Sequence, residues 1–181
     1  MNTLQKTLIA LATGSLLSVS AQAAVNYTGQ PYIGVKAGQI DINNDDLKDV
    51  DKATAYGVYG GYNFDPNIGV ELDYVGSEDV DYKGGTVNTK TYGAYGTYRY
   101  YFPNTGGLYG KAKLGIANTK TDADWKVAGQ TISKSSSDTG LAGGLGLGYS
   151  VSPNMSIEGE YDMTASDNDA KLWTIGAHVK F

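Results

Sequence analysis

Histidine and cysteine, which often carry enzyme chemistry or bind metals, are scarce in this 181-residue chain. It has one histidine, His178, and no cysteine. A zinc site needs several such ligands, and a catalytic serine needs a histidine and a carboxylate in a recognisable context. Serines are plentiful, but none stands in such a context. The sequence therefore predicts no metal site, no cofactor and no enzyme. His178 is expected to be a hydrogen-bonded interior residue.

Charged residues at alternating positions are the stronger chemical signal. In several segments every second residue is apolar, and the positions between them are charged or glycine. The charges in these segments are balanced and comprise Lys36, Arg99, Lys111, Lys113 and Lys180 with Glu71, Asp73, Glu158, Glu160 and Asp162. An unpaired buried charge costs several kcal/mol, so charges that are buried together must pair. We predict that these residues form a charge network inside the protein, which His178 and Lys180 adjoin.

Further acidic residues lie in polar segments between these runs. The run Asp41-Ile42-Asn43-Asn44-Asp45 mimics the start of a calcium loop, but it lacks the turn glycine and the closing glutamate. A solvated acidic rim is one interpretation, and a weak divalent-cation site is the other. Several lysines near these segments are expected to meet lipid phosphates, namely Lys48, Lys83, Lys120, Lys126 and Lys134.

The elements that must position these charges are β-strands, because apolar residues recur with a period of two. Eight such segments span residues 31–40, 54–64, 68–76, 89–102, 108–118, 141–151, 155–163 and 172–181. Short turns at 65–67, 103–107 and 152–154 alternate with polar loops at 41–51, 77–88, 119–138 and 164–170. This alternation is typical of an up-and-down barrel with periplasmic turns and external loops. The predicted fold is all-β: an eight-stranded antiparallel transmembrane β-barrel.

The apolar phase of the strands is predicted to face lipid, with the charged phase facing the lumen. A soluble eight-stranded barrel would have the opposite arrangement. Glycines on the charged phase suit a narrow interior, and aromatic residues of the apolar phase cluster near both strand ends. One cluster adjoins the short turns and the other the loops: Tyr62, Phe64, Tyr100, Phe102, Tyr149 and Phe181, then Tyr56, Tyr74, Tyr92, Tyr161 and Trp173. Two aromatic girdles are typical of an outer-membrane barrel.

The last segment is the most regular, and it is expected to pair with residues 31–40 to close the barrel. Its outward residues are predicted to form an assembly signal, namely Trp173, Ile175, Ala177, Val179 and Phe181. It resembles the C-terminal signature of bacterial outer-membrane barrels. The resemblance implies two kinds of partner, the barrel assembly machinery and periplasmic chaperones.

The first residues predict export. Lys6 precedes an apolar run, and Ala21-Gln22-Ala23 is a small-x-small cleavage site. Residues 1–23 are therefore read as a signal peptide, and 24–181 as one barrel domain in the cell outer membrane. A retained N-terminal helix is the alternative. The net charge of −5 argues against nucleic-acid binding.

Three groups of motifs carry a family resemblance. They are Gly34-Val35-Lys36-Ala37-Gly38, Gly60-Gly61-Tyr62 with Asp65-Pro66 and Ile68-Gly69-Val70-Glu71, and Tyr149-Ser150-Val151-Ser152-Pro153. Together they resemble the OmpA-type transmembrane barrel, within the broad family of small outer-membrane β-barrel domains. The similarity covers nearly all of residues 24–181, and no peptidoglycan-binding domain is expected after the barrel.

The resemblance implies an interior salt-bridged gate to which Lys36, Glu71 and Arg99 correspond. Gly148 stands where a glutamate is expected and Glu158 where an arginine is expected, so the charge ring is rearranged. We expect Glu158 to pair with Arg99 or Lys113.

The predicted function is that of a non-enzymatic outer-membrane barrel with a structural or surface role. Such a barrel is expected to be monomeric and to contact outer-membrane lipid and lipopolysaccharide. Two alternatives stay open. One is a narrow gated pore for small solutes, and the other is a surface adhesin that uses Trp125 and the loop at 119–138.

Overall fold

The computed structural model describes residues 29–42, 53–78, 80–82, 85–127, 130–165 and 170–181. The expected signal peptide and most of the first and fourth loops lie outside the described residues. Side chains are not described at strand positions 41–42, 80–82, 85–87, 123–127, 130–134, 165 and 170. The expectations for Asp41, Trp125, Lys126 and Lys134 therefore stay predictions.

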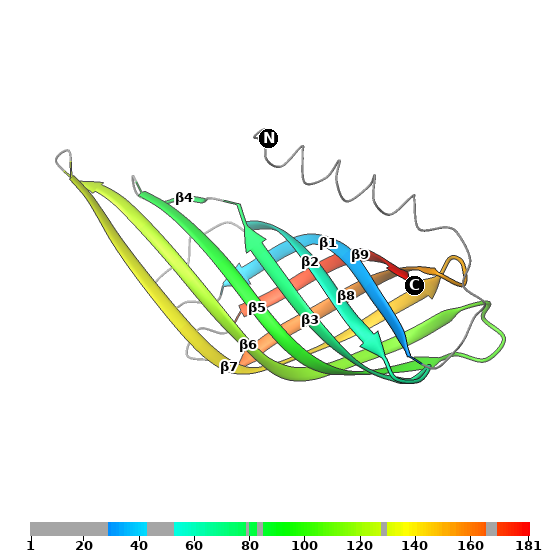
Figure 1. Ribbon diagram of the computed structural model, residues 1–181. Coiled ribbons are helices and arrows are strands. Elements are labelled where there is room, and N and C mark those ends of the chain that lie inside the picture. The colour runs from blue at the N-terminus through cyan, green and yellow to red at the C-terminus, as the bar shows by residue number, and fades with distance from the viewer. Residues whose placement is uncertain (1–28, 43–52, 79, 83–84, 128–129, 166–169) are drawn as a thin grey trace.

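Nine antiparallel strands are described: β1 (Gln30–Ile42), β2 (Ala53–Asn63), β3 (Ile68–Ser77), β4 (Val80–Tyr82), β5 (Gly85–Tyr101), β6 (Leu108–Val127), β7 (Gln130–Ser150), β8 (Met155–Ala165) and β9 (Ala170–Lys180). Eight of them pair in the order β3-β2-β1-β9-β8-β7-β6-β5, and a direct β3–β5 pairing closes the ring (Figure 1). The predicted eight-stranded barrel is confirmed. Strand β4 adds a short arm on the outer end of β5.

The first and last strands pair along their whole length, as the sequence predicts. Tyr32 lies opposite Lys180, and Ile40 lies opposite Leu172. Because β1 also pairs with β2 and β9 with β8, neither strand leaves a free edge within the ring. Closure satisfies the backbone donors and acceptors that an open sheet would expose to lipid.

The barrel is apolar outside and charged inside. Ile175, Leu145 and Leu72 are 71%, 70% and 67% exposed, whereas Glu71 and Arg99 are 0% and 2% exposed. In a water-soluble protein this distribution would leave apolar surface in water and charge in the core, both at a large free-energy cost. It fits a barrel whose exterior contacts lipid, as the alternating phases predict.

Aromatic pairs lie on the outer face at both ends of the barrel. Tyr62 stacks edge-on against Phe64 at a centroid distance of 5.4 Å, close to the short turn after β2. Toward the loops, Tyr161 lies 5.0 Å from Trp173 on the neighbouring strand. These pairs come from the two predicted girdles, so the barrel has an amphipathic belt at each end.

The short turns are fixed locally. The Asp65 carboxylate accepts hydrogen bonds from the backbone N–H groups of Asn67 and Ile68, each at 2.7 Å. The turn after β5 places Asn104, Gly106 and Gly107 at positive φ, a conformation that glycine and asparagine adopt most readily.

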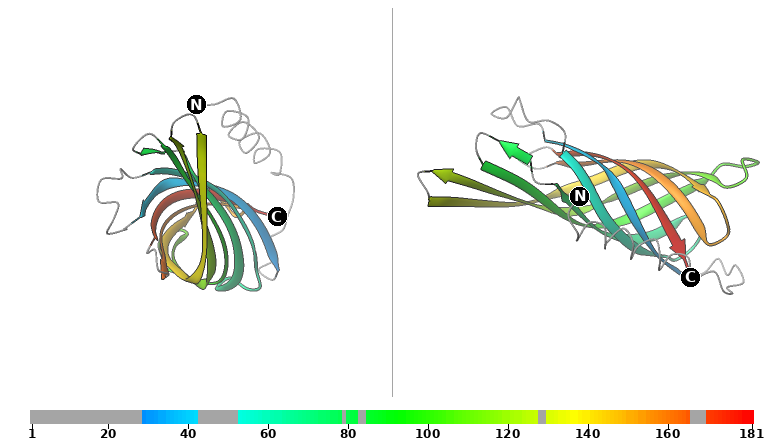
Figure 2. Two further views of the ribbon diagram at one scale, coloured as in Figure 1. Left: turned by 90° about the vertical axis from the view of Figure 1, so that its left-hand side faces the viewer. Right: turned by 90° about the horizontal axis from the view of Figure 1, so that it is seen from above.

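Two predicted loops are largely strand, which corrects the sequence interpretation. Strand β5 begins at Gly85 within the expected loop at 77–88, and β6 and β7 occupy most of the expected loop at 119–138. Figure 2 shows β5, β6 and β7 extending beyond the ring. The alternation of apolar residues ends where lipid contact ends, but strand pairing continues through threonine contacts such as Thr91 Oγ1 to Thr119 Oγ1 at 3.2 Å.

Within the described part of the chain, no helix is long and apolar enough to cross a membrane.

Candidate functional site

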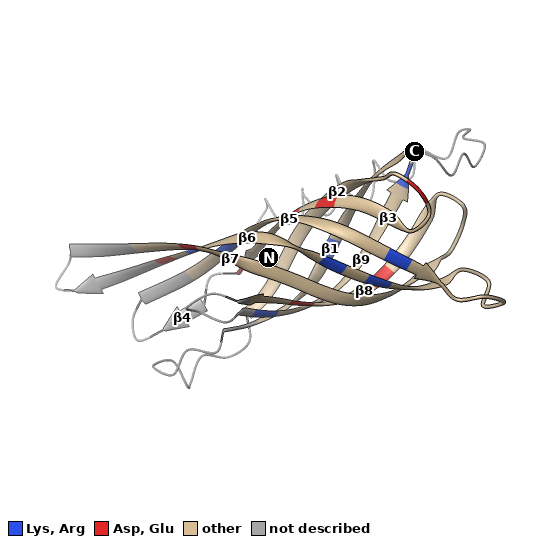
Figure 3. Ribbon diagram, turned by 90° about the horizontal axis from the view of Figure 1, so that it is seen from below, with Lys and Arg blue, Asp and Glu red and all other residues tan. Residues whose placement is uncertain are grey.

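The candidate functional site is the charge network that fills the lumen. The ten charged residues predicted to face the lumen are all buried: nine of them come from β1, β3, β5, β6 and β8, and Lys180 comes from β9. Figure 3 shows residues of both signs distributed along these strands. The members on β8 stand at every second position, so they share one face of that strand.

Glycines allow β6 and β8 to reach each other across β7. Gly146 lies opposite both Lys111 and Glu160, and Gly144 lies opposite both Lys113 and Asp162. A Cβ on Gly144 would collide with the Asp162 carboxylate. Positions 144 and 146 of β7 therefore have to lack side chains if lysines on one neighbouring strand are to meet carboxylates on the other.

Lys111 is at the centre of the network. Its Nζ lies 2.6 Å from Glu71 Oε2, 2.6 Å from Glu160 Oε1 and 3.0 Å from Glu158 Oε2. Oxygen atoms of these three carboxylates lie within 4.8 Å of one another, a spacing that a metal ion could bridge. The ammonium group contacts all three and supplies one positive charge, and Arg99 and Lys113 add further positive charge beside the same carboxylates.

A second group of ion pairs, the outer tier, lies closer to the loops. Lys113 Nζ is 2.9 Å from Asp162 Oδ2, 3.2 Å from Glu160 Oε2 and 3.5 Å from Asp73 Oδ2. Lys36 Nζ approaches the same group from β1, at 2.6 Å from Asp73 Oδ2. Each lysine contacts more than one carboxylate, so the tier is a network and not a set of separate pairs.

The tier next to the short turns is built from Arg99 and aromatic residues. The Arg99 guanidinium donates to the side-chain oxygen of Asn63, and its Nε lies 3.8 Å from Glu158 Oε1. Tyr109 donates to Glu158 Oε1 at 2.6 Å, and Tyr32 donates to Glu71 Oε2 at 2.8 Å.

His178 is fully buried in the same tier. Its Nδ1 lies 3.2 Å from the Tyr59 hydroxyl and 3.7 Å from Glu158 Oε1. The ring is also 4.9 Å from that of Tyr32. These contacts are those of a packed interior residue.

The pairing expected for Glu158 is partly right. Its carboxylate lies near Arg99, as expected, but the lysine that it contacts is Lys111 and not Lys113. The structure also explains why residue 148 is a glycine and not the expected glutamate. A Cβ at this position would collide with the ring of Tyr109, so no glutamate side chain can project there unless Tyr109 moves.

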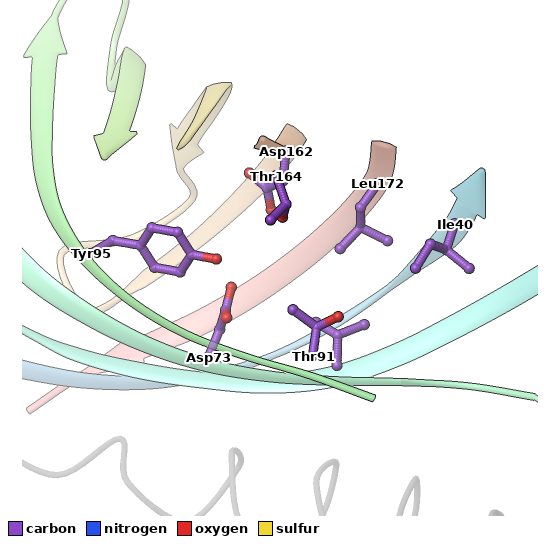
Figure 4. Close-up of a pocket in the computed structure, with 8 residues that line it drawn as sticks. Ile40, Asp73, Thr91, Tyr95, Asp162, Thr164 and Leu172 are labelled. Carbon is purple, nitrogen blue, oxygen red and sulfur yellow. The ribbon is translucent and has the colours of Figure 1, made fainter. Parts of the chain in front are cut away.

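Sequence reasoning missed two sets of lumen residues. The first is aromatic: Tyr32, Tyr59, Tyr95 and Tyr109 are 2%, 3%, 7% and 0% exposed. Their signal was their phase, which matches that of the charges. The second is an apolar cluster at the loop end, made of Ile40, Ala53, Ala55, Val75 and Leu172. A small cavity of about 20 Å³ lies between this cluster and the outer tier (Figure 4).

The predicted assembly residues, on β9 and at Phe181 directly after it, lie mostly on the outer face. Trp173, Ile175 and Phe181 are 65%, 71% and 53% exposed, and Ala177 is half-buried. Val179 was predicted to face outward, but it is buried. It lies opposite Ile33 on β1 and Met155 on β8.

Comparison with known proteins gives consistent matches. A family model described as an outer membrane protein beta-barrel domain matches residues 9–181. Outer membrane protein A of Salmonella typhi is 28% identical over 183 residues, which cover 96% of this chain and 51% of that protein. The chain thus spans about half the length of this curated relative.

Solved structures share the fold. Ail of Yersinia pestis superposes with a TM-score of 0.63 at 20% identity, covering 85% of this chain and 99% of that one. Neisserial surface protein A gives 0.64 at 17% identity, covering 83% and 97%. OprG of Pseudomonas aeruginosa gives 0.60 at 18% identity, covering 86% and 97%.

Proposed function

The chain belongs to the family of outer membrane protein beta-barrel domains, and from this premise we propose that it is a non-enzymatic structural barrel. In this proposal the lumen is a closed plug, and the part that extends beyond the membrane presents a surface for interactions. Residues 1–23 act as the export signal and residues 24–181 form the barrel domain. The partners are outer-membrane lipid and lipopolysaccharide, with periplasmic chaperones and the barrel assembly machinery during insertion, and the protein is a monomer.

The contacts of Lys111 carry the proposal of a plug. Its ammonium meets carboxylates from β3 and β8, so one side chain connects opposite walls of the ring. Side chains from eight strands are sufficient to fill the interior of such a narrow barrel. A solute could pass only if several of these ion pairs separated together, and each separated charge would be left buried without a partner.

Conductance in planar bilayers tests the plug against the narrow gated pore. We expect the refolded full chain to insert without producing conductance steps. Lys111→Met removes the central ammonium group, and Lys113→Met removes one from the outer tier. If the ion pairs form the barrier, both variants should conduct ions. Regular steps from the unsubstituted protein would contradict the plug and favour the pore.

A surface role is supported by the strands beyond the ring. Strands β5, β6 and β7 stay paired well past the aromatic girdle, and Asn118 links β6 to β7 through hydrogen bonds to Ser137 and Thr139 at 3.0 and 2.7 Å. A paired extension holds a surface segment on a rigid framework, and such segments often carry binding residues. This observation favours a surface role for residues 119–138, and adhesion is one form that this role could take.

Binding to host cells or matrix by cells that display the protein tests this surface role. A variant in which residues 120–137 are replaced by a short turn should lose binding while still reaching the membrane. Equal binding by the shortened and complete proteins would remove the adhesin alternative.

A further inference from the structure

The outer tier of the lumen network carries more negative than positive charge. Lys36 and Lys113 face three carboxylates there, those of Asp73, Glu160 and Asp162. Lys111 adds one charge from the central tier, but it also contacts Glu71 and Glu158. Arg99 contacts Glu158 from the tier next to the short turns. The excess carboxylate charge therefore lies on the side of the loops, where Asp162 is the last acidic residue of the β8 series.

Oxygen atoms of this tier are left without hydrogen-bond donors. In the described part of the chain, Asp162 Oδ1 and Asp73 Oδ1 accept no hydrogen bond, whereas the Oδ2 atom of each aspartate faces a lysine ammonium, that of Lys113 and Lys36 respectively. The Asp73 side chain is only 3% exposed. A buried carboxylate oxygen without a hydrogen-bond donor is costly, and a further cation beside the two Oδ1 atoms would remove this cost and balance the excess charge of the tier.

The small cavity adjoins these oxygens. Asp73 and Asp162 line it together with the hydroxyl-bearing residues Thr91, Tyr95 and Thr164. Tyr95 is 7% exposed, and its hydroxyl group makes no hydrogen bond to another described residue. Figure 4 shows this hydroxyl directed toward the two aspartates. It is a buried polar group aimed at a polar cavity, independent of the acidic residues themselves.

The remaining wall is apolar. Ile40, Val75 and Leu172 line the cavity on the side of the loops and belong to the buried apolar cluster. An apolar wall excludes bulk water and strengthens the attraction between a bound cation and the carboxylates. The cavity volume of about 20 Å³ is enough for a group of the size of one water molecule.

We infer that this cavity, formed by Asp73, Asp162, Tyr95, Thr91 and Thr164, binds a small monovalent metal cation such as sodium. Carboxylate and hydroxyl oxygens are hard donors that suit hard cations. A single positive charge matches the local excess. The ammonium groups of Lys36 and Lys113 already lie within 3 Å of the same two carboxylates and would oppose a divalent ion. This site goes beyond the structural role of the barrel, and it does not depend on whether the lumen conducts.

Thermal unfolding of the detergent-folded full chain tests the inference. Sodium chloride is compared with N-methyl-glucamine chloride at equal ionic strength, because the organic cation is too large for the cavity. A ligand that binds only the folded state raises its stability, and about 1 kcal/mol corresponds to roughly 2–4 °C in a domain of this size. We expect a saturable rise of about 3 °C in sodium. Sodium-23 relaxation should report the same binding without unfolding.

Three variants make the test specific. Asp162→Asn removes the excess charge and should abolish the sodium response. Thr164→Val keeps the shape and all charges but removes an oxygen, so it should weaken the response even if Asp162→Asn folds poorly. Asp122→Asn changes a partly exposed aspartate paired with Lys120 and should respond like the unsubstituted protein. An unsubstituted protein without a sodium response, or variants of the cavity that respond normally, would overturn the inference.

Discussion

Lys111 and Glu160 lie on strands that are not neighbours in the barrel, yet Lys111 Nζ and Glu160 Oε1 are 2.6 Å apart across the face of Gly146. The glycines on β7 and the charged residues on β6 and β8 therefore work together to form the network. Lysines on β6 can pair with carboxylates on β8 because the strand between them has no side chain at Gly144 and Gly146. The charge network is therefore set as much by where side chains are missing as by the charges.

Removing the central ammonium should destabilise the barrel strongly. Lys111→Met leaves Glu71, Glu158 and Glu160 without their shared partner, and breaking a buried ion pair from one side costs about 3–5 kcal/mol. Chemical denaturation in detergent, followed by the gel mobility of folded and unfolded forms, measures the change. Lys120→Met is the matched control, because the Lys120 side chain is 47% exposed, and it should shift the free energy of unfolding by less than about 0.5 kcal/mol.

Restoring the charge balance should recover part of this loss. In Lys111→Met with Glu71→Gln, one carboxylate charge is removed together with the ammonium. We expect the double variant to be more stable than Lys111→Met alone, because the two side chains are in contact and their effects are coupled. Strict additivity of the two single changes would show that the contact contributes nothing.

Gly148 and Gly159 should differ sharply when changed to alanine. A Cβ on Gly148 meets the ring of Tyr109, whereas a Cβ on Gly159 has nothing within 4 Å. Gly148→Ala should therefore cost about 1–3 kcal/mol through overpacking, and Gly159→Ala should be close to neutral. Urea unfolding of both variants in the same detergent makes the comparison. Equal stabilities would mean that Tyr109 repacks freely.

The two phases of each strand were predictable because lipid and lumen demand opposite chemistry at alternate positions. Lys36, Glu71 and Asp162 could be assigned to the interior on this basis alone. The lumen tyrosines share this phase, but tyrosine also suits the membrane interface, so residue type gave no reason to expect their contacts with the charges. Individual ion pairs were also beyond the sequence. Lys111 and Lys113 are interchangeable in pattern, and only register and the depth of each strand decide which one reaches Glu158.

The ends of β5, β6 and β7 were not predictable for a related reason. Outside the lipid both faces of a strand contact water, so the alternation that marks a membrane strand disappears. Residues such as Thr119, Thr121 and Ser137 then resemble a loop in composition. Their pairing depends on hydroxyl contacts and on continuity with the strands below, which a local pattern does not contain.

The exposed apolar face gives the most direct test that the barrel contacts lipid. Leu145 is 70% exposed and lies midway along the part of β7 that pairs with β8, so its side chain is expected near the centre of the bilayer. Arginine at such a position costs about 2–4 kcal/mol in a lipid bilayer, whereas an exposed position in water would tolerate it. Ser136 is exposed on the extension of the same strand, beyond the residues that pair with β8, and it serves as the control. We expect Leu145→Arg to lower the free energy of unfolding in lipid vesicles by this amount and Ser136→Arg to leave it unchanged. If both variants behaved alike, the outer face of the ring would not be in contact with hydrocarbon, and the inside-out distribution of charge would need another explanation.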